Sequence, residues 1–256
     1  MLLAIDIGNT NSVFAVVIDG KVREQFRMRT DAGRTADEYF VWFSTLCTAR
    51  GVELNVDQVI LTSTVPAAIF NIRVLSHRYF SGEPLVVGSE NCQLDLPVRL
   101  DAGTGVGPDR LVNAIAGFVK YGPDLIVVDF GTATTFDIVG SDGGYEGGVI
   151  ATGVNLSLKA LSDAAAALPH VDVVRPEKVI GTNTKGAMQS GIYWGYISLI
   201  EGMCERIQNE YGKPMKVILT GGLASLFAKG TTKFDALDGD LTIEGLILIS
   251  ERNGQK

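Results

Sequence analysis

The sequence predicts an α/β fold made of two similar halves, with a mixed sheet in each half. Short apolar runs typical of strands alternate along the chain with longer stretches of helical apolar spacing. Residues 3–9 (LAIDIGN) have a pattern in which an apolar strand is followed by Asp, an apolar residue, Gly and a small polar residue. Residues 126–132 (IVVDFGT) repeat this pattern. The repeat indicates internal duplication.

The first half begins with strand signals. Residues 2–6 and 13–18 are apolar runs separated by a polar turn, and the second run ends at Asp19-Gly20, a dipeptide typical of two-residue β-hairpins. Further elements follow in order: a helix over residues 36–50, a strand over 59–63, a helix over 66–79 and a short strand over 85–87. A glycine-rich stretch then leads to a helix over 111–118, which places Asp109 and Arg110 at a helix start.

The second half repeats the alternation. Its predicted elements are strands over residues 125–129, 136–139 and 216–219, helices over 156–168 and 185–211, a glycine turn at 220–222 that opens another helix, and a closing helix over 241–249. We expect two domains, residues 1–118 and 119–256, packed against each other with a cleft between them.

Composition excludes several classes of function. A formal net charge of −7 without a strong Lys/Arg cluster argues against a nucleic-acid partner. Cys47, Cys92 and Cys204 are far apart, and His77 and His170 have no neighbouring Cys or His, so neither a metal site built on Cys and His nor histidine catalysis is expected. Because no apolar run reaches the roughly 20 residues of a membrane span and the N-terminus lacks a leader pattern, we expect a soluble, cytoplasmic protein.

The turn after the first strand suits phosphate. In residues 6–11 (DIGNTN), Gly8 permits a tight turn that exposes backbone N–H groups, and the Asn and Thr side chains add hydrogen-bond donors. The carboxylate of Asp6 would repel phosphate unless a cation lies between them, so its expected role is to hold Mg²⁺ through water. An ordinary turn capped by Asp6 is the alternative.

Asp129 ends the matching strand of the second half, and residues 131–135 (GTATT) are rich in hydroxyls. A cation and phosphates would satisfy this carboxylate, although N–H groups of the turn could do the same. Gly221 and Gly222 follow another apolar strand and would let a nucleotide approach the backbone, or they form a plain strand-to-helix turn.

Asp109 is the best candidate for deprotonating an alcohol. It lies in Gly107-Pro108-Asp109-Arg110, where the glycine leaves room for a substrate and the arginine can contact an anion or the transferred phosphoryl group. A helix cap is the alternative role for this aspartate. Neither a P-loop nor a dinucleotide-binding fingerprint is present, so the duplicated turn is the expected phosphate site.

Six ordered motifs together resemble one known family. They are residues 6–11 (DIGNTN), 107–114 (GPDRLVNA), 129–135 (DFGTATT), 147–151 (GGVIA), 181–184 (GTNT) and 220–222 (TGG). Over residues 2 to about 249 the chain resembles the type III pantothenate kinases of the actin-like superfamily, which also contains acetate and sugar kinases. The resemblance implies duplicated actin-like (ribonuclease H-like) domains with an ATP cleft between them.

The resemblance also implies roles for individual residues. ATP phosphates would bind the turn formed by Asp6, Ile7, Gly8, Asn9, Thr10, Asn11, Ser12 and Val13, and Thr132 would contact ATP. Asp109 would accept the proton of the pantothenate hydroxyl, with Gly107, Pro108, Arg110 and Thr184 in the pantothenate pocket. Asp129 would bind K⁺ or NH₄⁺. The family forms homodimers, so a homodimer is expected.

Two departures from the family pattern are visible. Residues 100–105 (LDAGTG) stand where relatives carry an Asn-Pro stretch, and residues 151–153 (ATG) stand where Ala-Pro-Gly is usual. Two alternatives to pantothenate phosphorylation remain: a kinase of the same fold for another small hydroxy or carboxylic acid, and a nucleotide-binding regulatory relative without catalysis.

Overall fold

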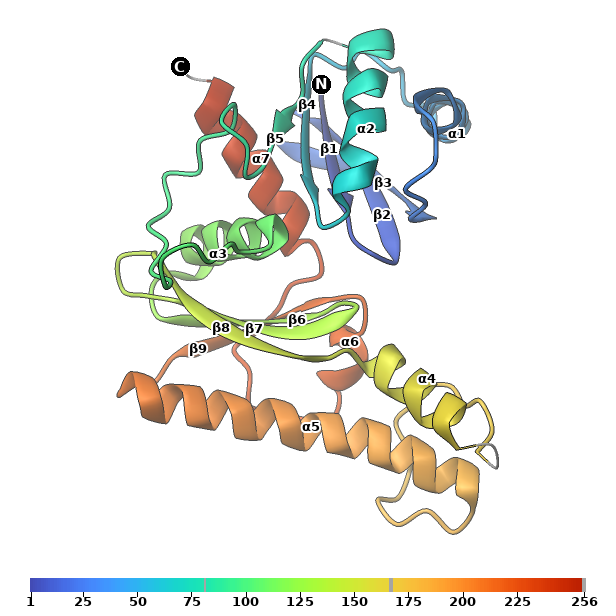
Figure 1. The fold of residues 1–256 in the computed structure, drawn as a ribbon, viewed down its shortest axis with the longest axis vertical. Helices are drawn as coiled ribbons and strands as arrows, with labels where there is room; N and C mark the ends of the chain where they lie inside the picture. Colours follow the sequence, from blue (N-terminus) through green and yellow to red (C-terminus); the bar gives the residue numbers. More distant parts are fainter. Residues whose placement is uncertain (81, 166–167, 255–256) are drawn as a thin grey trace. The chain divides into compact units, whose positions relative to one another are not determined.

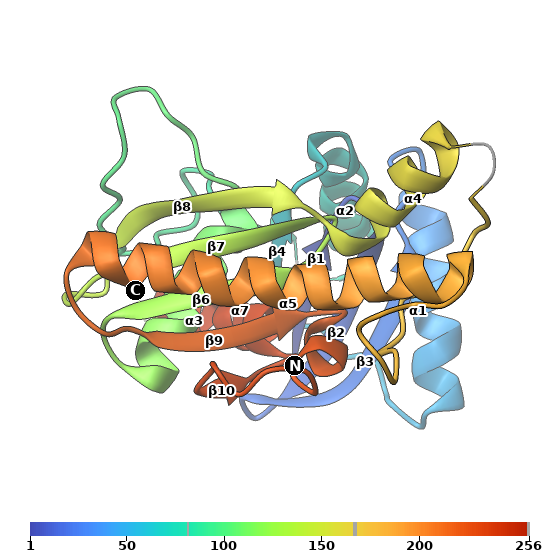
Figure 2. The ribbon, with the colours of Figure 1, turned by 90° about the horizontal axis from the view of Figure 1, so that it is seen from below.

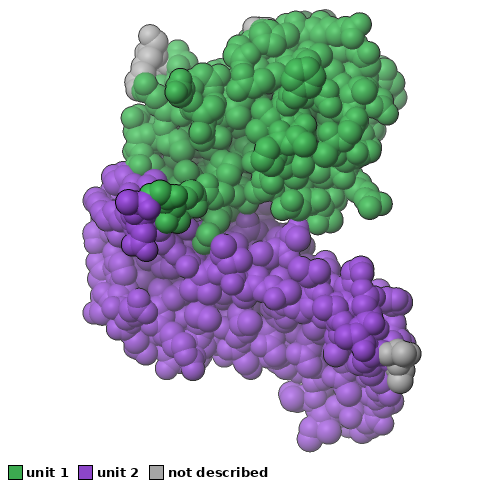
Figure 3. Space-filling model, viewed as in Figure 1, with its two compact units in different colours: residues 1–96, 103–116, 241–256 green, residues 97–102, 117–240 purple. Residues whose placement is uncertain are grey.

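In this computed structural model, which describes residues 1–80, 82–165 and 168–254, the chain divides into two compact units (Figure 3). Unit 1 contains residues 1–96, 103–116 and 241–256, and unit 2 contains residues 97–102 and 117–240. The division falls inside helix α3 (Pro108–Tyr121). These units are defined by packing, and the two domains expected at residues 1–118 and 119–256 stay a prediction.

Unit 1 is built on a five-stranded mixed sheet in the order β3-β2-β1-β4-β5. Its strands are β1 (Leu2–Ile7), β2 (Asn11–Ile18), β3 (Lys21–Arg29), β4 (Gln58–Ser63) and β5 (Leu85–Val86). Pairing is antiparallel from β1 to β2 and from β2 to β3, and parallel from β1 to β4 and from β4 to β5. The predicted hairpin loop is present, with φ of 51° at Asp19 and 72° at Gly20, as the left-handed geometry of a two-residue turn requires.

Helices cover both faces of this sheet. Helices α1 (Ala36–Ala49) and α2 (Pro66–Tyr79) pack on the face that carries Phe14 and Leu61. The first part of α3 and the last helix, α7 (Leu241–Gly254), pack on the opposite face, where Ala4 and Ile60 lie. Successive strand residues point to opposite faces, so the alternation along β1 and β4 divides the core of unit 1 into these two layers.

Unit 2 repeats the same sheet topology. Its order is β10-β9-β6-β7-β8, and its strands are β6 (Leu125–Phe130), β7 (Ala133–Val139), β8 (Tyr145–Thr152), β9 (Lys216–Gly221) and β10 (Ala236–Leu237). When β6 to β10 are matched with β1 to β5, every neighbour and every parallel or antiparallel pairing is the same. The duplication predicted from the sequence is therefore confirmed at the level of the strands.

One face of the second sheet is covered by a long helix. Helix α5 (Thr184–Tyr211) runs across β9, β6 and β7 (Figures 1 and 2) and buries Tyr193 and Ile200 against them. The short helix α6 (Ala224–Phe227) adds Phe227, whose ring stacks on Phe130 with centroids 5.1 Å apart. Helix α4 (Val154–Ala164) completes this layer.

The structure differs from the sequence-based elements in several places, among them strand β3 (Lys21–Arg29), which follows the predicted hairpin turn but was not predicted as a strand. The helix predicted over residues 156–168 ends at Ala164, in keeping with Pro169 shortly beyond it; residues 166–167 of that prediction lie outside the described part. Strand β8 was not predicted because Gly147 and Gly148 weaken a strand pattern. Strand β10 has two residues, too few for a periodic signal. Within the described residues, none of the helices has the length and apolar character needed to cross a bilayer.

Candidate active site

The first Asp-Gly turn lies in unit 1 at the end of β1. In the sheet, Asp6 lies beside Val13 of β2 and beside Thr62 of β4. The turn is closed by the Gly8 N–H, which donates to the Asn11 carbonyl oxygen at 3.0 Å. A Cβ added at Gly8 would lie 3.2 Å from that oxygen, so the tight turn favours glycine here.

Hydroxyl groups hold this turn in place. Thr30 Oγ1 donates to the Gly8 carbonyl oxygen at 2.6 Å and lies 2.9 Å from Ser12 Oγ, while Asn9 Nδ2 donates to Thr64 Oγ1 at 3.3 Å. Of the predicted phosphate-binding residues, three have exposed side chains and three are buried. The exposed ones are Asn9, Thr10 and Asn11, and the buried ones are Ile7, Ser12 and Val13. The buried members support the turn, and the exposed members lie at its surface.

The second Asp-Gly turn lies in unit 2 at the end of β6. Asp129 lies beside Thr135 of β7 and beside Thr220 of β9, and the Gly131 N–H closes the turn by donating to the Ala133 carbonyl oxygen at 3.0 Å. Gly221 has φ of +90°, and a Cβ added to it would overlap Asp129 Oδ1. The structure therefore brings Asp129 and the predicted Gly221 together, with Gly222 exposed beside them.

Gly153 packs against the same turn and was not among the predicted site residues. It precedes α4, and a Cβ added to it would overlap the Thr132 carbonyl oxygen. The close approach brings the N-terminus of α4 beside the exposed Thr132. Its sequence signal was residues 151–153 (ATG), which stand out only as a departure from the family pattern.

Asp109 lies in the first turn of α3, as predicted. The Gly107 carbonyl oxygen accepts the Arg110 N–H at 3.1 Å and starts the helix. A Cβ added at Gly107 would lie 2.6 Å from Asp109 Oδ1, so a larger residue would displace the carboxylate. Glycine at this position thus leaves room for the group that the sequence singled out as the base.

The environment of Asp109 suits a proton acceptor. The residue is half-buried, its Oδ1 atom is inaccessible to solvent, and this atom has no hydrogen-bond partner among the described residues. Burial raises the pKa of Asp109 above the ordinary carboxyl value, and the backbone N–H and positive charge of Arg110 oppose that rise. A carboxylate whose pKa is raised toward neutrality is a better general base than an exposed one.

A pocket of about 310 Å³ adjoins the start of α3 within unit 1. Pro108 and Leu111 of α3 line one side, and Ser63 of β4 and Arg73 of α2 are among the polar residues that line the rest. The pocket therefore lies between the carboxyl ends of β4 and β5 and the helix turn that carries Asp109. Ligands of α/β sheets commonly bind at such strand ends.

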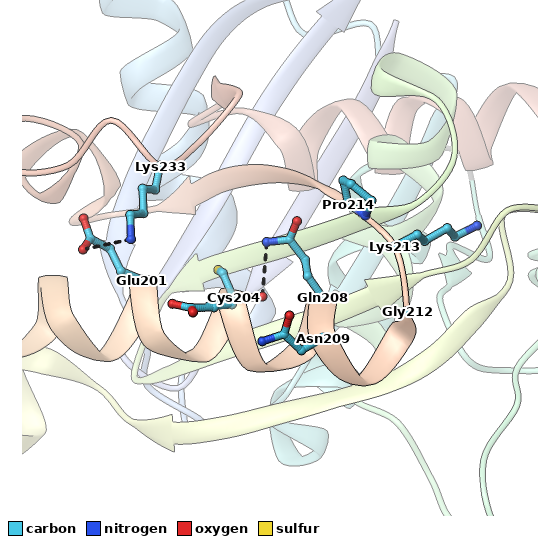
Figure 4. A pocket seen from close by; sticks show the side chains of 9 residues that line it. Glu201, Cys204, Gln208, Asn209, Gly212, Lys213, Pro214 and Lys233 are labelled. Carbon is cyan, nitrogen blue, oxygen red and sulfur yellow. Dashed lines mark hydrogen bonds and ion pairs between the residues drawn. The ribbon is translucent and has the colours of Figure 1, made fainter.

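A larger hollow of about 570 Å³ lies elsewhere, along α5 in unit 2 (Figure 4). Acidic and basic side chains share it, and Lys233 lies 3.8 Å from Glu201. Among the described residues that line this hollow, none is a predicted site residue. It is separate from the candidate active site.

Thr184 is the first residue of α5 and is exposed. Asn183 caps the helix, since its Oδ1 accepts the Gly186 N–H at 2.8 Å. Thr184, Thr132 and Asp129 belong to unit 2, whereas Asp6, Asp109 and Arg110 belong to unit 1. A shared site formed by the two groups stays a prediction.

The chain is similar to known proteins over its whole length. The sequence model of the family described as type III pantothenate kinase matches residues 2–206. Proteins of that name from Ruegeria sp. (strain TM1040) and Paracoccus denitrificans (strain Pd 1222) are 58% and 59% identical over 253 residues, which cover 99% of this chain and 97% and 98% of the relatives.

Solved structures agree on the fold. A protein from Sinorhizobium meliloti assigned as a 2-dehydro-3-deoxygalactonokinase superposes with a TM-score of 0.63 at 13% identity, covering 98% of this chain and 96% of that one. This likeness to a sugar kinase agrees with the duplicated actin-like fold class. With a family model that covers most of the chain and relatives of such high identity, the chain belongs to the type III pantothenate kinase family.

Proposed function

We propose that this chain transfers the γ-phosphoryl group of ATP to pantothenate, giving 4'-phosphopantothenate in the first step of coenzyme A biosynthesis. The observation that carries the proposal is the half-buried Asp109, whose Oδ1 has no hydrogen-bond partner among the described residues, in a chain of this family whose two halves each end a central strand in an Asp-Gly turn. The cytoplasm is the proposed location.

In the proposed mechanism, ATP phosphates accept hydrogen bonds from the backbone of the Gly8 turn and from the exposed side chains of Asn9, Thr10 and Asn11. Asp6 holds Mg²⁺ through water. The residues fit this ion, because a half-buried carboxylate at a strand end next to the buried hydroxyl of Thr62 offers oxygen atoms of the kind that bind Mg²⁺ or its water. Mg²⁺ neutralises charge on the phosphates when bound.

A monovalent cation, K⁺ or NH₄⁺, is proposed at Asp129. The fit rests on the half-buried carboxylate of Asp129, which offers oxygen atoms to a cation and packs where a Cβ at residue 221 would clash. A cation beside Asp129 offsets a negative charge that would repel the triphosphate. Thr132, Gly221 and Gly222 then contact ATP from the second half of the chain.

The transfer step is an in-line displacement. The hydroxyl oxygen of pantothenate attacks the γ-phosphorus, the bond from that phosphorus to the β,γ-bridging oxygen breaks, and ADP leaves with the bond electrons. The hydroxyl proton passes to Asp109. Gly107, Pro108 and Arg110 contact the acceptor, and the guanidinium of Arg110 stabilises negative charge on the substrate or on the transferred group.

We also propose a homodimer in which Thr184 completes the pantothenate pocket. Ile180 and Val179, just before Thr184, are 81% and 62% exposed, and Ile150 of β8 is 66% exposed. In the proposed dimer, a second copy covers exposed apolar side chains of this kind. Light scattering of the purified protein should give twice the mass of one 27.3 kDa chain; the mass of one chain would contradict the proposal.

The reaction itself is tested by incubating purified protein with ATP, Mg²⁺, K⁺ and pantothenate. We expect one phosphopantothenate for each ADP formed, measured by mass spectrometry. Turnover with another small hydroxy or carboxylic acid but none with pantothenate would favour a different acceptor. ATP binding without turnover of any acceptor would favour a regulatory relative.

A further inference from the structure

The internal repeat extends to a second pair of strands. Residues 59–62 of β4 and residues 217–220 of β9 have the same sequence, VILT, and these strands hold equivalent positions in the two sheets. In each sheet the threonine that ends the repeat lies beside the strand-end aspartate: Thr62 beside Asp6, and Thr220 beside Asp129. Both threonines are buried. An Asp-Thr pair is therefore part of the duplicated turn in each half.

Thr62 is unusual in its hydrogen bonding. The residue is 0% exposed, and its Oγ1 atom has no hydrogen-bond partner among the described residues. An unsatisfied buried polar atom destabilises a fold, and valine has nearly the same shape without that atom. Packing alone therefore does not account for a hydroxyl at this position.

The neighbouring hydroxyl behaves differently. Ser63 Oγ donates to the Val65 carbonyl oxygen at 3.0 Å and accepts the Val65 N–H at 3.0 Å, which fixes the turn before α2. Ser63 is thus used by the fold itself. Thr62, one residue earlier, is the hydroxyl of this strand end that the fold does not use.

The direction of Thr62 follows from the strand alternation. Ala4 and Ile60, two residues before Asp6 and Thr62, belong to the core cluster that includes Val112 of α3. Asp6 and Thr62 consequently face the same layer, beneath the helix whose first turn carries Asp109. Because Thr62 is paired with Asp6 in the sheet, the two side chains are neighbours on that face.

We propose that Thr62 is a positioning residue for the metal-bound nucleotide: its hydroxyl and the Asp6 carboxylate share one water of the Mg²⁺ hydration shell in bound MgATP. The inference rests on the proposed function of Asp6. It explains why a buried hydroxyl without a protein partner stands at the end of β4, since a Mg²⁺-bound water supplies the missing partner.

The test compares Thr62→Val, which removes the hydroxyl, with Thr62→Ser, which keeps it. Calorimetry measures ATP binding with Mg²⁺ and in EDTA, and thermal unfolding is recorded without ligand. We expect Thr62→Val to weaken MgATP binding about 3- to 10-fold, the size of one hydrogen bond, and to leave binding in EDTA unchanged. Thr62→Ser should restore MgATP affinity to within about twofold of wild type.

The Tm measured by thermal unfolding distinguishes a role of Thr62 in binding MgATP from a role in stabilising the fold. Thr62→Val should not lower Tm, because the hydroxyl has no partner in the fold. Ser76→Ala is the matched control, since Ser76 is 1% exposed in the same unit but donates to the Gly82 carbonyl oxygen at 2.5 Å. That variant should lower Tm and leave the Mg²⁺ dependence of ATP binding unchanged.

Two outcomes would contradict different claims. If wild type binds MgATP more tightly than ATP in EDTA and Thr62→Val does so equally well, the role of Thr62 is wrong and the proposed function stands. If the affinity of wild type for ATP does not respond to Mg²⁺, the proposed role of Asp6 fails, and the role of Thr62 fails with it.

Discussion

Gly221→Ala should strain the second Asp-Gly turn and displace the carboxylate of Asp129. The new Cβ would overlap Asp129 Oδ1 and lie 2.6 Å from the Phe130 backbone nitrogen, at a φ of +90° that other residues rarely adopt. Backbone strain of about 1–3 kcal/mol and overpacking of about 1–3 kcal/mol together give a loss of about 2–6 kcal/mol.

At roughly 2–4 °C per kcal/mol for a chain of this size, Tm should fall by roughly 5–20 °C. Because the carboxylate of Asp129 has to move, the K⁺ concentration for half-maximal rate should also rise. Scanning calorimetry and a K⁺ titration of the kinase rate measure the two effects.

The matched control is Gly239→Ala, which adds a methyl group in the same unit where no atom lies within 4 Å. Its stability should stay within about 0.5 kcal/mol of wild type. If Gly221→Ala behaves like this control in both Tm and K⁺ dependence, then Gly221 does not approach Asp129 as described.

Three further predictions follow from the packing and charge of single residues. Because burial raises the pKa of Asp109, its ionised form destabilises the fold above that pKa. Asp109→Asn should therefore raise Tm at about pH 8, and the difference in Tm should vanish toward about pH 4. An equal difference at both pH values would contradict the burial of Asp109. Burial raises the pKa of Cys47 and Cys92 to about 11 and that of Cys204 to about 12. A thiol reagent at about pH 8 should therefore label these cysteines only after denaturation. Rapid labelling of the native protein would contradict their burial. Thr35→Ala removes the capping box in which the Glu38 N–H donates to Thr35 Oγ1 at 3.3 Å. Chemical denaturation should show that the free energy of unfolding falls by about 1 kcal/mol. An unchanged free energy of unfolding would contradict the cap.

The sequence was most informative where local pattern decides structure. The hairpin at Asp19-Gly20 and the helix start at Asp109 depend on turn and capping chemistry within a few residues, and both are present. The duplication was visible because the Asp-Gly turns keep their spacing from an apolar strand.

Features that depend on tertiary contact were not accessible from sequence. Gly153 approaches Thr132 only after α4 folds back to the second turn, and glycine spacing alone does not show this. The isolation of Thr62 Oγ1 likewise depends on which side chains surround it in three dimensions. The VILT repeat could have indicated Thr62 and Thr220, but only the sheet register shows that each lies beside an aspartate.

The central claim, that Asp109 accepts the proton of the acceptor alcohol, is tested most directly by the turnover rate of Asp109→Asn measured beside its affinity for MgATP. The amide keeps the shape of the side chain but cannot take the proton, so kcat should fall about 10²- to 10⁴-fold. MgATP affinity should stay within about twofold of wild type, because a general base acts on the acceptor and not on the nucleotide. A variant that keeps the wild-type kcat would show that Asp109 is not the base.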